Sequence, residues 1–120
     1  MIFVVDDEKD VRELVTRMVQ RMGYTVACAA DGQEALHKLR GLTSVRLLLT
    51  DVQLPGGLHG VALAQHAREL HPQIKVLFMS GYPQNHLSGD QTLDADTNLI
   101  SKPFQRQELA QRLLALLSPD

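Results

Sequence analysis

The sequence predicts an α/β domain in which helices cover both faces of a doubly wound, parallel five-stranded sheet. Short apolar runs recur along its 120 residues, and segments with helical spacing separate them. The runs are almost continuously hydrophobic, which is typical of strands buried on both faces. Connections between parallel strands are right-handed, and each must cover a sheet face. Five runs fit this pattern, at residues 2–5, 24–29, 45–50, 74–79 and 98–101.

The first predicted helix has the clearest periodicity. Apolar residues recur from Val11 to Met22 at helical spacing, while charged residues occupy the positions between them. Gly23 follows and suits the C-terminal cap of this helix. Asp31 can cap the start of a second helix, which we expect to end near Gly41.

Two further helices follow from the same spacing. One is expected over residues 60–70, because apolar residues recur there and Pro72 comes after them. The last is expected over residues 105–117. Segment 83–96 is polar and is interrupted by Gly89, so a helix there would be short. With that segment, the domain would contain five helices.

Composition and charge exclude several classes of protein. The formal net charge is −2, and the basic residues are too dispersed to form a stripe for nucleic acid. Cys28 is the sole cysteine, so an internal disulfide is impossible and a reducing cytoplasm suits the chain. No apolar run approaches the roughly 18 residues of a spanning helix, which predicts a soluble protein without membrane insertion.

Acidic side chains follow two of the predicted strands. In open α/β sheets, ligands bind beyond the carboxyl ends of the strands. If the strand order is 2-1-3-4-5, Asp6 and Asp7 after the first strand converge with Asp51 after the third. Two carboxylates about 5 Å apart repel by roughly 3 kcal/mol at an effective dielectric of about 20. Three together need a cation, and Mg²⁺ suits a site made of oxygen ligands.

The remaining strand ends supply groups for phosphoryl transfer. Asp51 can act as a nucleophile and form an aspartyl phosphate. Lys102 follows the fifth strand and would neutralise a phosphoryl oxygen, while the Ser80 hydroxyl after the fourth strand could hydrogen-bond another. This set of residues predicts phosphoryl transfer at the carboxyl edge of the sheet.

Four segments, VVDDE, LLLTDVQLPGGLHG, VLFMSGY and SKPF, resemble the signatures of the receiver domain of two-component response regulators, in matching order and spacing. The resemblance covers residues 1–120 and implies a flavodoxin-like fold. It implies that Asp51 accepts a phosphoryl group from a histidine kinase or a histidine phosphotransfer protein. The domain would then be a signalling switch that catalyses only its own phosphorylation and dephosphorylation. Its output surface would lie near the fourth helix, fifth strand and fifth helix.

The resemblance also implies a ligand set for Mg²⁺ or another divalent cation such as Mn²⁺. Asp7 and Asp51 would bind the ion directly, Asp6 would act mainly through water, and the backbone carbonyl of Gln53 would add a ligand. In the family fold the corresponding side chain points near the path of the attacking water, so a change of Gln53 is expected to alter the lifetime of the phosphoryl group more than its acceptance.

The last two motifs receive roles by the same resemblance. Ser80 would be the hydroxyl switch residue, and Lys102 would contact the phosphoryl group. The peptide bond between Lys102 and Pro103 is expected to be cis.

Three departures from the family pattern narrow the prediction. Leu99 stands where the family usually has an aromatic residue, which argues against an aromatic switch. The loop LPGGLHG is one residue longer than usual and, with MSGY, resembles receivers of hybrid sensor histidine kinases. The chain could therefore be a module of such a kinase. Asn98 replaces an acid that could pair with Arg112, so a dimer of that kind is not expected.

Other interpretations of single motifs remain. Asp6 and Asp7 alone could mark a helix N-terminus, and Asp51 alone a turn residue before Pro55. A phosphatase with an aspartyl intermediate typically has a second acid where Gln53 stands, and a flavin or nucleotide site would need a glycine-rich loop in place of DDEKD. A docking module without phosphorylation would not need the charge cluster.

The five histidines lack ligand spacing and are expected on the solvated surface: His37, His59, His66, His71 and His86.

Overall fold

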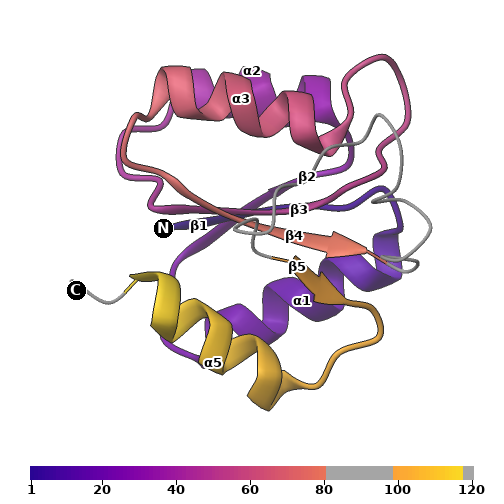
Figure 1. Cartoon of the computed structure of the whole chain (residues 1–120), viewed down its shortest axis with the longest axis vertical. Helices are drawn as coiled ribbons and strands as arrows, with labels where there is room; N and C mark the ends of the chain where they lie inside the picture. Colours follow the sequence, from indigo (N-terminus) through magenta and orange to yellow (C-terminus); the bar gives the residue numbers. More distant parts are fainter. Residues whose placement is uncertain (81–98, 118–120) are drawn as a thin grey trace.

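A computed structural model describes residues 1–80 and 99–117. Five strands form one parallel sheet in the order β2-β1-β3-β4-β5, which confirms the predicted sheet and its order (Figure 1). The strands are β1 (Ile2–Val5), β2 (Val26–Ala29), β3 (Leu47–Asp51), β4 (Lys75–Ser80) and β5 (Leu99–Ser101).

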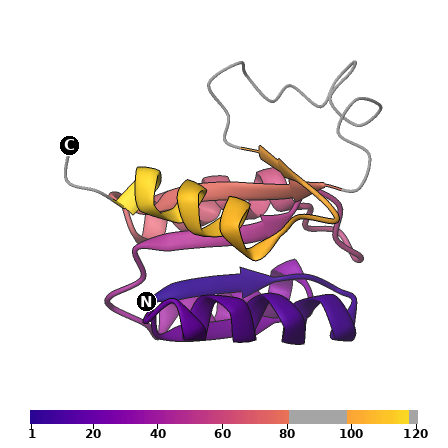
Figure 2. The ribbon, with the colours of Figure 1, turned by 90° about the horizontal axis from the view of Figure 1, so that it is seen from below.

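Helices cover both faces of this sheet. The described residues contain α1 (Lys9–Arg21), α2 (Gly32–Arg40), α3 (Gly60–Leu70) and α5 (Arg106–Leu117). Helices α2 and α3 pack on one face, and α1 and α5 lie side by side on the other (Figures 1 and 2). The predicted helix in segment 83–96 lies outside the described residues.

The core consists of two layers because successive strand residues point to opposite faces. Phe3 and Leu48 belong to the layer beneath α2 and α3, together with Leu63 of α3. Val4 and Leu49 belong to the layer beneath α1 and α5. Each fully buried side chain of this size contributes about 1.5–3 kcal/mol relative to its exposed state. Burial on both sides thus explains the near-continuous apolar runs of β1, β3 and β4, whereas the edge strands β2 and β5 are only partly buried.

The predicted capping residues lie at the start of α2 and one residue beyond the C-cap of α1. Met22 caps α1, and Gly23 follows with a φ of 99°, a conformation that favours glycine. At the start of α2, the Asp31 side chain accepts a hydrogen bond from the backbone N–H of Glu34 at 2.7 Å. Glu34 reaches back, and its Oε1 accepts from the backbone N–H of Ala30 at 2.8 Å. This reciprocal arrangement resembles a capping box.

One histidine differs from its prediction. His71 is half-buried at the C-terminal end of α3, and its Nε2 lies 2.9 Å from the backbone carbonyl oxygen of Leu39 at the end of α2. The ring therefore joins the ends of two helices rather than standing free in solvent. His37, His59 and His66 are exposed as expected. Among the described helices, none has the length and apolar character needed to cross a membrane.

The cap of α2 predicts a pH-dependent contribution from Glu34. Its hydrogen bond from Ala30, and then its contact with Lys38, lower the pKa of the carboxyl below 4.5. A lowered folded-state pKa stabilises the fold above the unfolded-state value, and this contribution is lost as the pH falls through the folded-state value. We expect Glu34→Gln to reduce the free energy of unfolding by about 0.3–1 kcal/mol at pH 7.

Urea denaturation of both proteins at pH 7 and near pH 3 checks this expectation. The difference between wild type and Glu34→Gln should shrink at the acidic pH. Glu69→Gln, which changes an exposed acid in the last turn of α3, serves as the control and should not lower stability. A difference that is independent of pH would contradict the role given to the charge of Glu34.

Candidate functional site

The polar strand ends meet at the carboxyl edge of the sheet. Asp6 follows β1, Asp51 ends β3, and Ser80 ends β4. The parallel register places Thr50 opposite Val5 and Asp51 opposite Met79. An open cleft of about 840 Å³ lies here, and its lining includes Asp7, Glu8, Asp51, Gln53, Ser80 and Lys102.

Three acids cluster at this edge of the sheet. Asp6, Asp7 and Asp51 each offer a carboxylate oxygen, and these oxygens all lie within 4.8 Å of one another. Asp6 is completely buried and Asp51 is 8% exposed, whereas Asp7 is exposed. Carboxylates held this close destabilise one another unless positive charge lies between or beside them.

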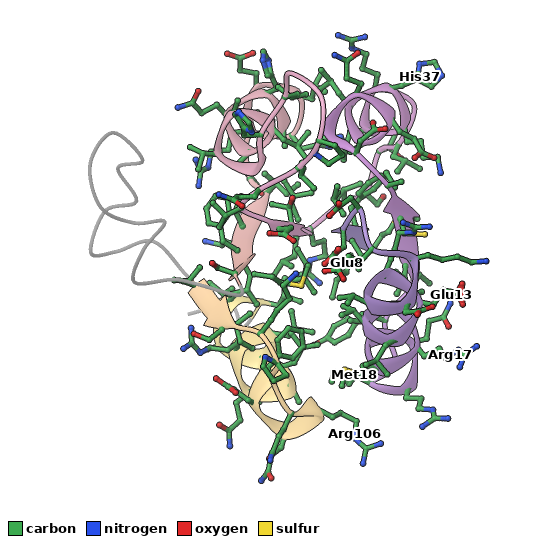
Figure 3. The ribbon with its side chains drawn as sticks, turned by 90° about the vertical axis from the view of Figure 1, so that its right-hand side faces the viewer. Glu8, Glu13, Arg17, Met18, His37 and Arg106 are labelled. Carbon is green, nitrogen blue, oxygen red and sulfur yellow. The ribbon has the colours of Figure 1, made fainter. Side chains whose placement is uncertain are left out.

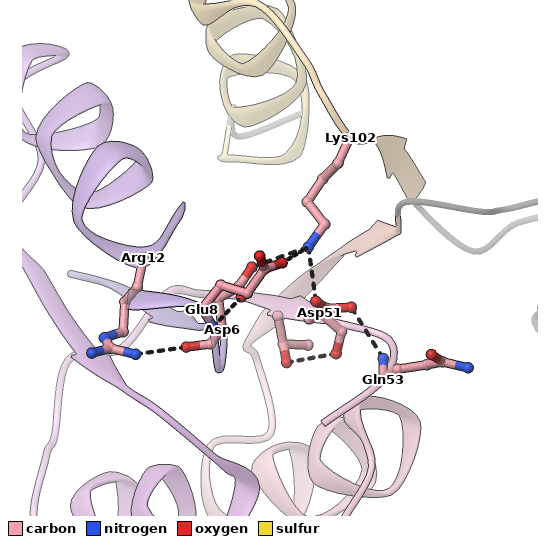
Figure 4. Close-up of polar contacts among 7 residues, drawn as sticks. Asp6, Glu8, Arg12, Asp51, Gln53 and Lys102 are labelled. Carbon is pink, nitrogen blue, oxygen red and sulfur yellow. Dashed lines mark hydrogen bonds and ion pairs between the residues drawn. The ribbon is translucent and has the colours of Figure 1, made fainter. Parts of the chain in front are cut away.

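Lys102 supplies positive charge at the same place. Its Nζ donates to Asp51 Oδ2 at 2.8 Å and to Asp6 Oδ2 at 3.2 Å (Figure 4). Glu8 Oε1 lies 4.0 Å from the same nitrogen. The backbone N–H of Lys102 donates to the carbonyl of Ser80 at 2.7 Å, which fixes the start of the lysine side chain. The Lys102–Pro103 peptide bond is cis, as predicted.

Burial and charge act in opposite directions on these groups. Burial raises the pKa of Asp6, and the nearby charge of Asp51 adds to this effect, while hydrogen bonds from Glu8 N–H and Lys102 oppose it. Burial by itself would lower the pKa of Lys102, but the hydrogen bond and charge of Asp51, together with Asp6, raise it above 10.5. The ammonium is therefore held in its charged form at neutral pH.

Backbone groups orient both buried acids. Glu8 N–H donates to Asp6 Oδ1 at 2.9 Å, and Gln53 N–H donates to Asp51 Oδ1 at 3.1 Å. Arg12 of α1 donates from Nη1 to the main-chain oxygen of Asp6 at 2.9 Å. These bonds leave the acids with limited freedom at the edge of the sheet.

Gly60 allows the first turn of α3 to pack against the end of β3. A Cβ atom at this position would overlap the carbonyl oxygen of Asp51. The Gly60 N–H donates to the carbonyl of Val52 at 3.0 Å. A side chain here would displace the segment that carries Asp51, so glycine is required by the close approach of the two backbones.

Leu99 and Arg112, which concern the departures from the family pattern, both make defined contacts in the structure. Leu99 is half-buried in β5 and packs against the layer beneath α2 and α3. Arg112 Nη1 donates to the carbonyl of Leu99 at 2.9 Å. Arg112 thus binds a backbone oxygen, and Asn98 lies outside the described residues.

Every predicted site residue is found at this edge, and some contributors were missed. Ser80 is buried and lines the cleft, while Gln53 is exposed beside Asp51. The contributions of Glu8, Arg12 and Gly60 were not predicted. The spacing of Glu8 and Arg12 from the two aspartates was visible in the sequence, but their contacts have no characteristic motif.

The donor set fits a hard divalent cation. The clustered groups offer carboxylate oxygens only, two of them on buried side chains, and such oxygens suit Mg²⁺ or Mn²⁺ better than softer metals. Asp6, Asp7 and Asp51 are therefore the described residues that could hold such an ion.

Comparison with known proteins agrees with this fold. The profile of the response regulator receiver domain matches residues 2–114. The response regulator receiver protein CpdR of Brucella abortus is 29% identical, over 97% of this chain and 95% of its own length. Sensor kinase CckA of the same organism is 35% identical over 97% of this chain, which spans only 12% of that kinase.

Solved structures show the same similarity. The receiver domain of the hybrid histidine kinase CckA superimposes with a TM-score of 0.81 at 32% identity, and 98% of each chain is covered. The receiver domain of NtrX from Brucella abortus gives a TM-score of 0.83 at 29% identity over the full length of both chains.

The sheet order and the acidic cleft define a flavodoxin-like α/β domain with its site at the carboxyl edge of the strands. The chain belongs to the response regulator receiver domain family, the signalling domains of two-component systems. Its relatives include both response regulators and receivers within kinases.

The charge arrangement predicts that removal of the Lys102 ammonium strongly lowers the stability of the fold. In Lys102→Met, Asp6 and Asp51 lose their shared cation while they remain buried, so we expect the free energy of unfolding to fall by about 3–5 kcal/mol without divalent cations. Denaturant titration with chelator present measures the change.

Lys9→Met is the matched control for this substitution. Lys9 is an exposed lysine whose Nζ lies 3.9 Å from Glu13, a pair of the kind that contributes about 0.3–0.5 kcal/mol. Equal losses for the two variants would show that Lys102 has no special part in neutralising the buried acids.

Proposed function

We propose that residues 1–120 form a single receiver domain that accepts a phosphoryl group on Asp51. The observation that carries this proposal is the contact between Asp51 and the Lys102 ammonium, whose Nζ lies 2.8 Å from Asp51 Oδ2, within a cluster that also contains Asp6 and Asp7. A carboxylate in an open cleft, beside a fixed cation, has the requirements of a nucleophile toward phosphorus.

The reaction is a transfer between nitrogen and oxygen. A carboxylate oxygen of Asp51 attacks the phosphorus of a phosphohistidine, a P–O bond forms, and the P–N bond breaks with its electron pair returning to the imidazole. Lys102 then shifts part of its bonding from the carboxylate to a phosphoryl oxygen, and the Ser80 hydroxyl hydrogen-bonds another. Positioning and charge stabilisation supply most of the catalysis in such transfers.

The acids would hold a divalent cation during this reaction. We assign Asp7, Asp51 and the backbone carbonyl of Gln53 as direct ligands, with Asp6 acting through water. The ion, Mg²⁺ or Mn²⁺, supplies positive charge that neutralises phosphoryl oxygens. Asp6 also holds Lys102 in place, since its Oδ2 accepts from the ammonium at 3.2 Å.

The proposed phosphodonor is a histidine kinase or a histidine phosphotransfer protein. The similarity to a receiver within a sensor kinase supports this assignment, and the chain could be fused to such a hybrid kinase. The cleft is also lined on one side by apolar groups, Leu14 and Met18 of α1 with Phe104 after β5. Leu14 is 56% exposed, which suits contact with the protein that presents the phosphohistidine. The donor and the receiver would meet in the cytoplasm.

Phosphorylation of Asp51 would change a surface that output partners read. We place this surface around β5 and α5, close to Ser80 and Lys102 in the fold. The backbone bond from Lys102 to Ser80 joins the ends of β4 and β5, so movement of the lysine head group would be felt by both strands.

The central test is covalent labelling. Incubation with acetyl phosphate and Mg²⁺, followed by intact mass spectrometry, should give one phosphoryl adduct. The adduct should be absent from Asp51→Asn and in the presence of chelator. An adduct that persists in Asp51→Asn would contradict the assignment of Asp51. When a candidate substrate is added in excess, phosphate release in many multiples of the protein concentration, beyond the release that decay of the adduct accounts for, would indicate an enzyme instead of a switch.

Gln53 is expected to control how long the phosphoryl group persists. Its side chain is exposed two residues after Asp51 and lines the cleft through which an attacking water would enter. We expect Gln53→Ala to change the half-life of the adduct several-fold while leaving the rate of labelling within about twofold, as for a residue that affects only the second step. Decay of the adduct after removal of acetyl phosphate measures this. Equal half-lives in the two proteins would exclude the role.

A further inference from the structure

Arg12 connects α1 to the loop that carries the first two acids. Its Nη1 donates to the main-chain oxygen of Asp6 at 2.9 Å, and its own backbone N–H donates to Glu8 in the first turn of the helix (Figure 4). The oxygen that it binds belongs to the peptide between Asp6 and Asp7. We propose that Arg12 is a positioning residue that fixes this peptide and so directs both carboxylates toward the divalent cation.

This inference rests on the proposed function, because it assumes that Asp6 and Asp7 face a cation. The other bonds of the loop explain why one more is needed. The Asp6 N–H donates to the carbonyl of Ala29 at 3.3 Å, which is long, and Asp6 Oδ1 accepts from Glu8 at 2.9 Å. Asp7 is exposed, so its direction depends on the backbone that precedes it. Rotation of the Asp6–Asp7 peptide would move the Asp7 carboxylate away from Asp51.

Charge alone predicts the opposite role for Arg12. A guanidinium near the acids repels a divalent cation, so removal of its charge would strengthen cation binding. Part of the charge of Arg12 is balanced by Glu34. The pKa of Glu34 is lowered first by the hydrogen bond from Ala30 N–H, then by Lys38, and also by the charge of Arg12. If Arg12 acts by position, its removal weakens binding in spite of the gain in attraction. The two mechanisms therefore differ in the sign of the effect.

The test measures binding of Mn²⁺ alone, by electron paramagnetic resonance, with no phosphodonor present. Wild type is compared with Arg12→Met, which keeps an apolar stem and loses the donor, and with Arg12→Lys, which keeps a donor and the charge. Arg17→Met is the matched control. Arg17 is an exposed arginine of the same helix that points away from the molecule, and its replacement changes the charge by the same amount (Figure 3). Far-UV circular dichroism confirms folding of each variant at the titration temperature.

We expect the Kd of Arg12→Met for Mn²⁺ to rise about tenfold or more, as for other groups that orient metal ligands. The Kd of Arg12→Lys should stay within about threefold of the wild-type value, because lysine still supplies a donor. The Kd of Arg17→Met should stay within about twofold, because Arg17 points away from the site. A folded Arg12→Met that binds Mn²⁺ as tightly as wild type, or more tightly, overturns the positioning role.

Two further outcomes are distinguishable from that one. If Arg12→Met does not fold, Arg12→Gln removes the same charge and shortens the reach of the donor, and the same criterion applies to it. If wild type itself fails to bind Mn²⁺, the proposed metal site is wrong and the positioning role is overturned with it.

Discussion

The contact of one ammonium with two buried carboxylates is the interaction on which the rest of the structure depends. Removal of charged groups from water costs several kcal/mol for each ion, and a buried acid is tolerated only when its charge is compensated. Asp6 and Asp51 are compensated by Lys102, which lies 96 and 51 positions away in the sequence. The fold must therefore bring the ends of β1, β3 and β5 together before this edge becomes stable.

The topology of a parallel sheet brings these strand ends together. Each crossover helix returns the chain to the same side, so every strand ends at the same edge. Strand β3 lies at the centre of the order, next to β1, and strand β4 separates β3 from β5. The lysine must then span the end of β4, where its backbone is joined to Ser80. A long, flexible side chain with a compact charge meets this requirement.

The strands, most helix ends and the acidic cluster could be predicted from the sequence, because each leaves a periodic or paired signal. Burial on both faces accounts for the apolar runs of β1, β3 and β4, and the cap of α2 was visible in Asp31. The bond from Arg12 to a backbone oxygen could not be predicted, since any residue supplies that acceptor. The need for glycine at position 60 depends on the distance between two backbones, and the contact of His71 with Leu39 depends on how α2 and α3 pack.

The charge of the site would link the stability of this domain to its proposed function. When ionised, Asp6, Asp7 and Asp51 carry three negative charges against one positive charge from Lys102, which leaves −2. One divalent cation cancels that excess. A phosphoryl group on Asp51 would add negative charge again. Lys102 already contacts Asp51 and could bind the added group by moving from the carboxylate to a phosphoryl oxygen. Since the backbone N–H of the lysine donates to Ser80, such a movement would be transmitted to the ends of β4 and β5.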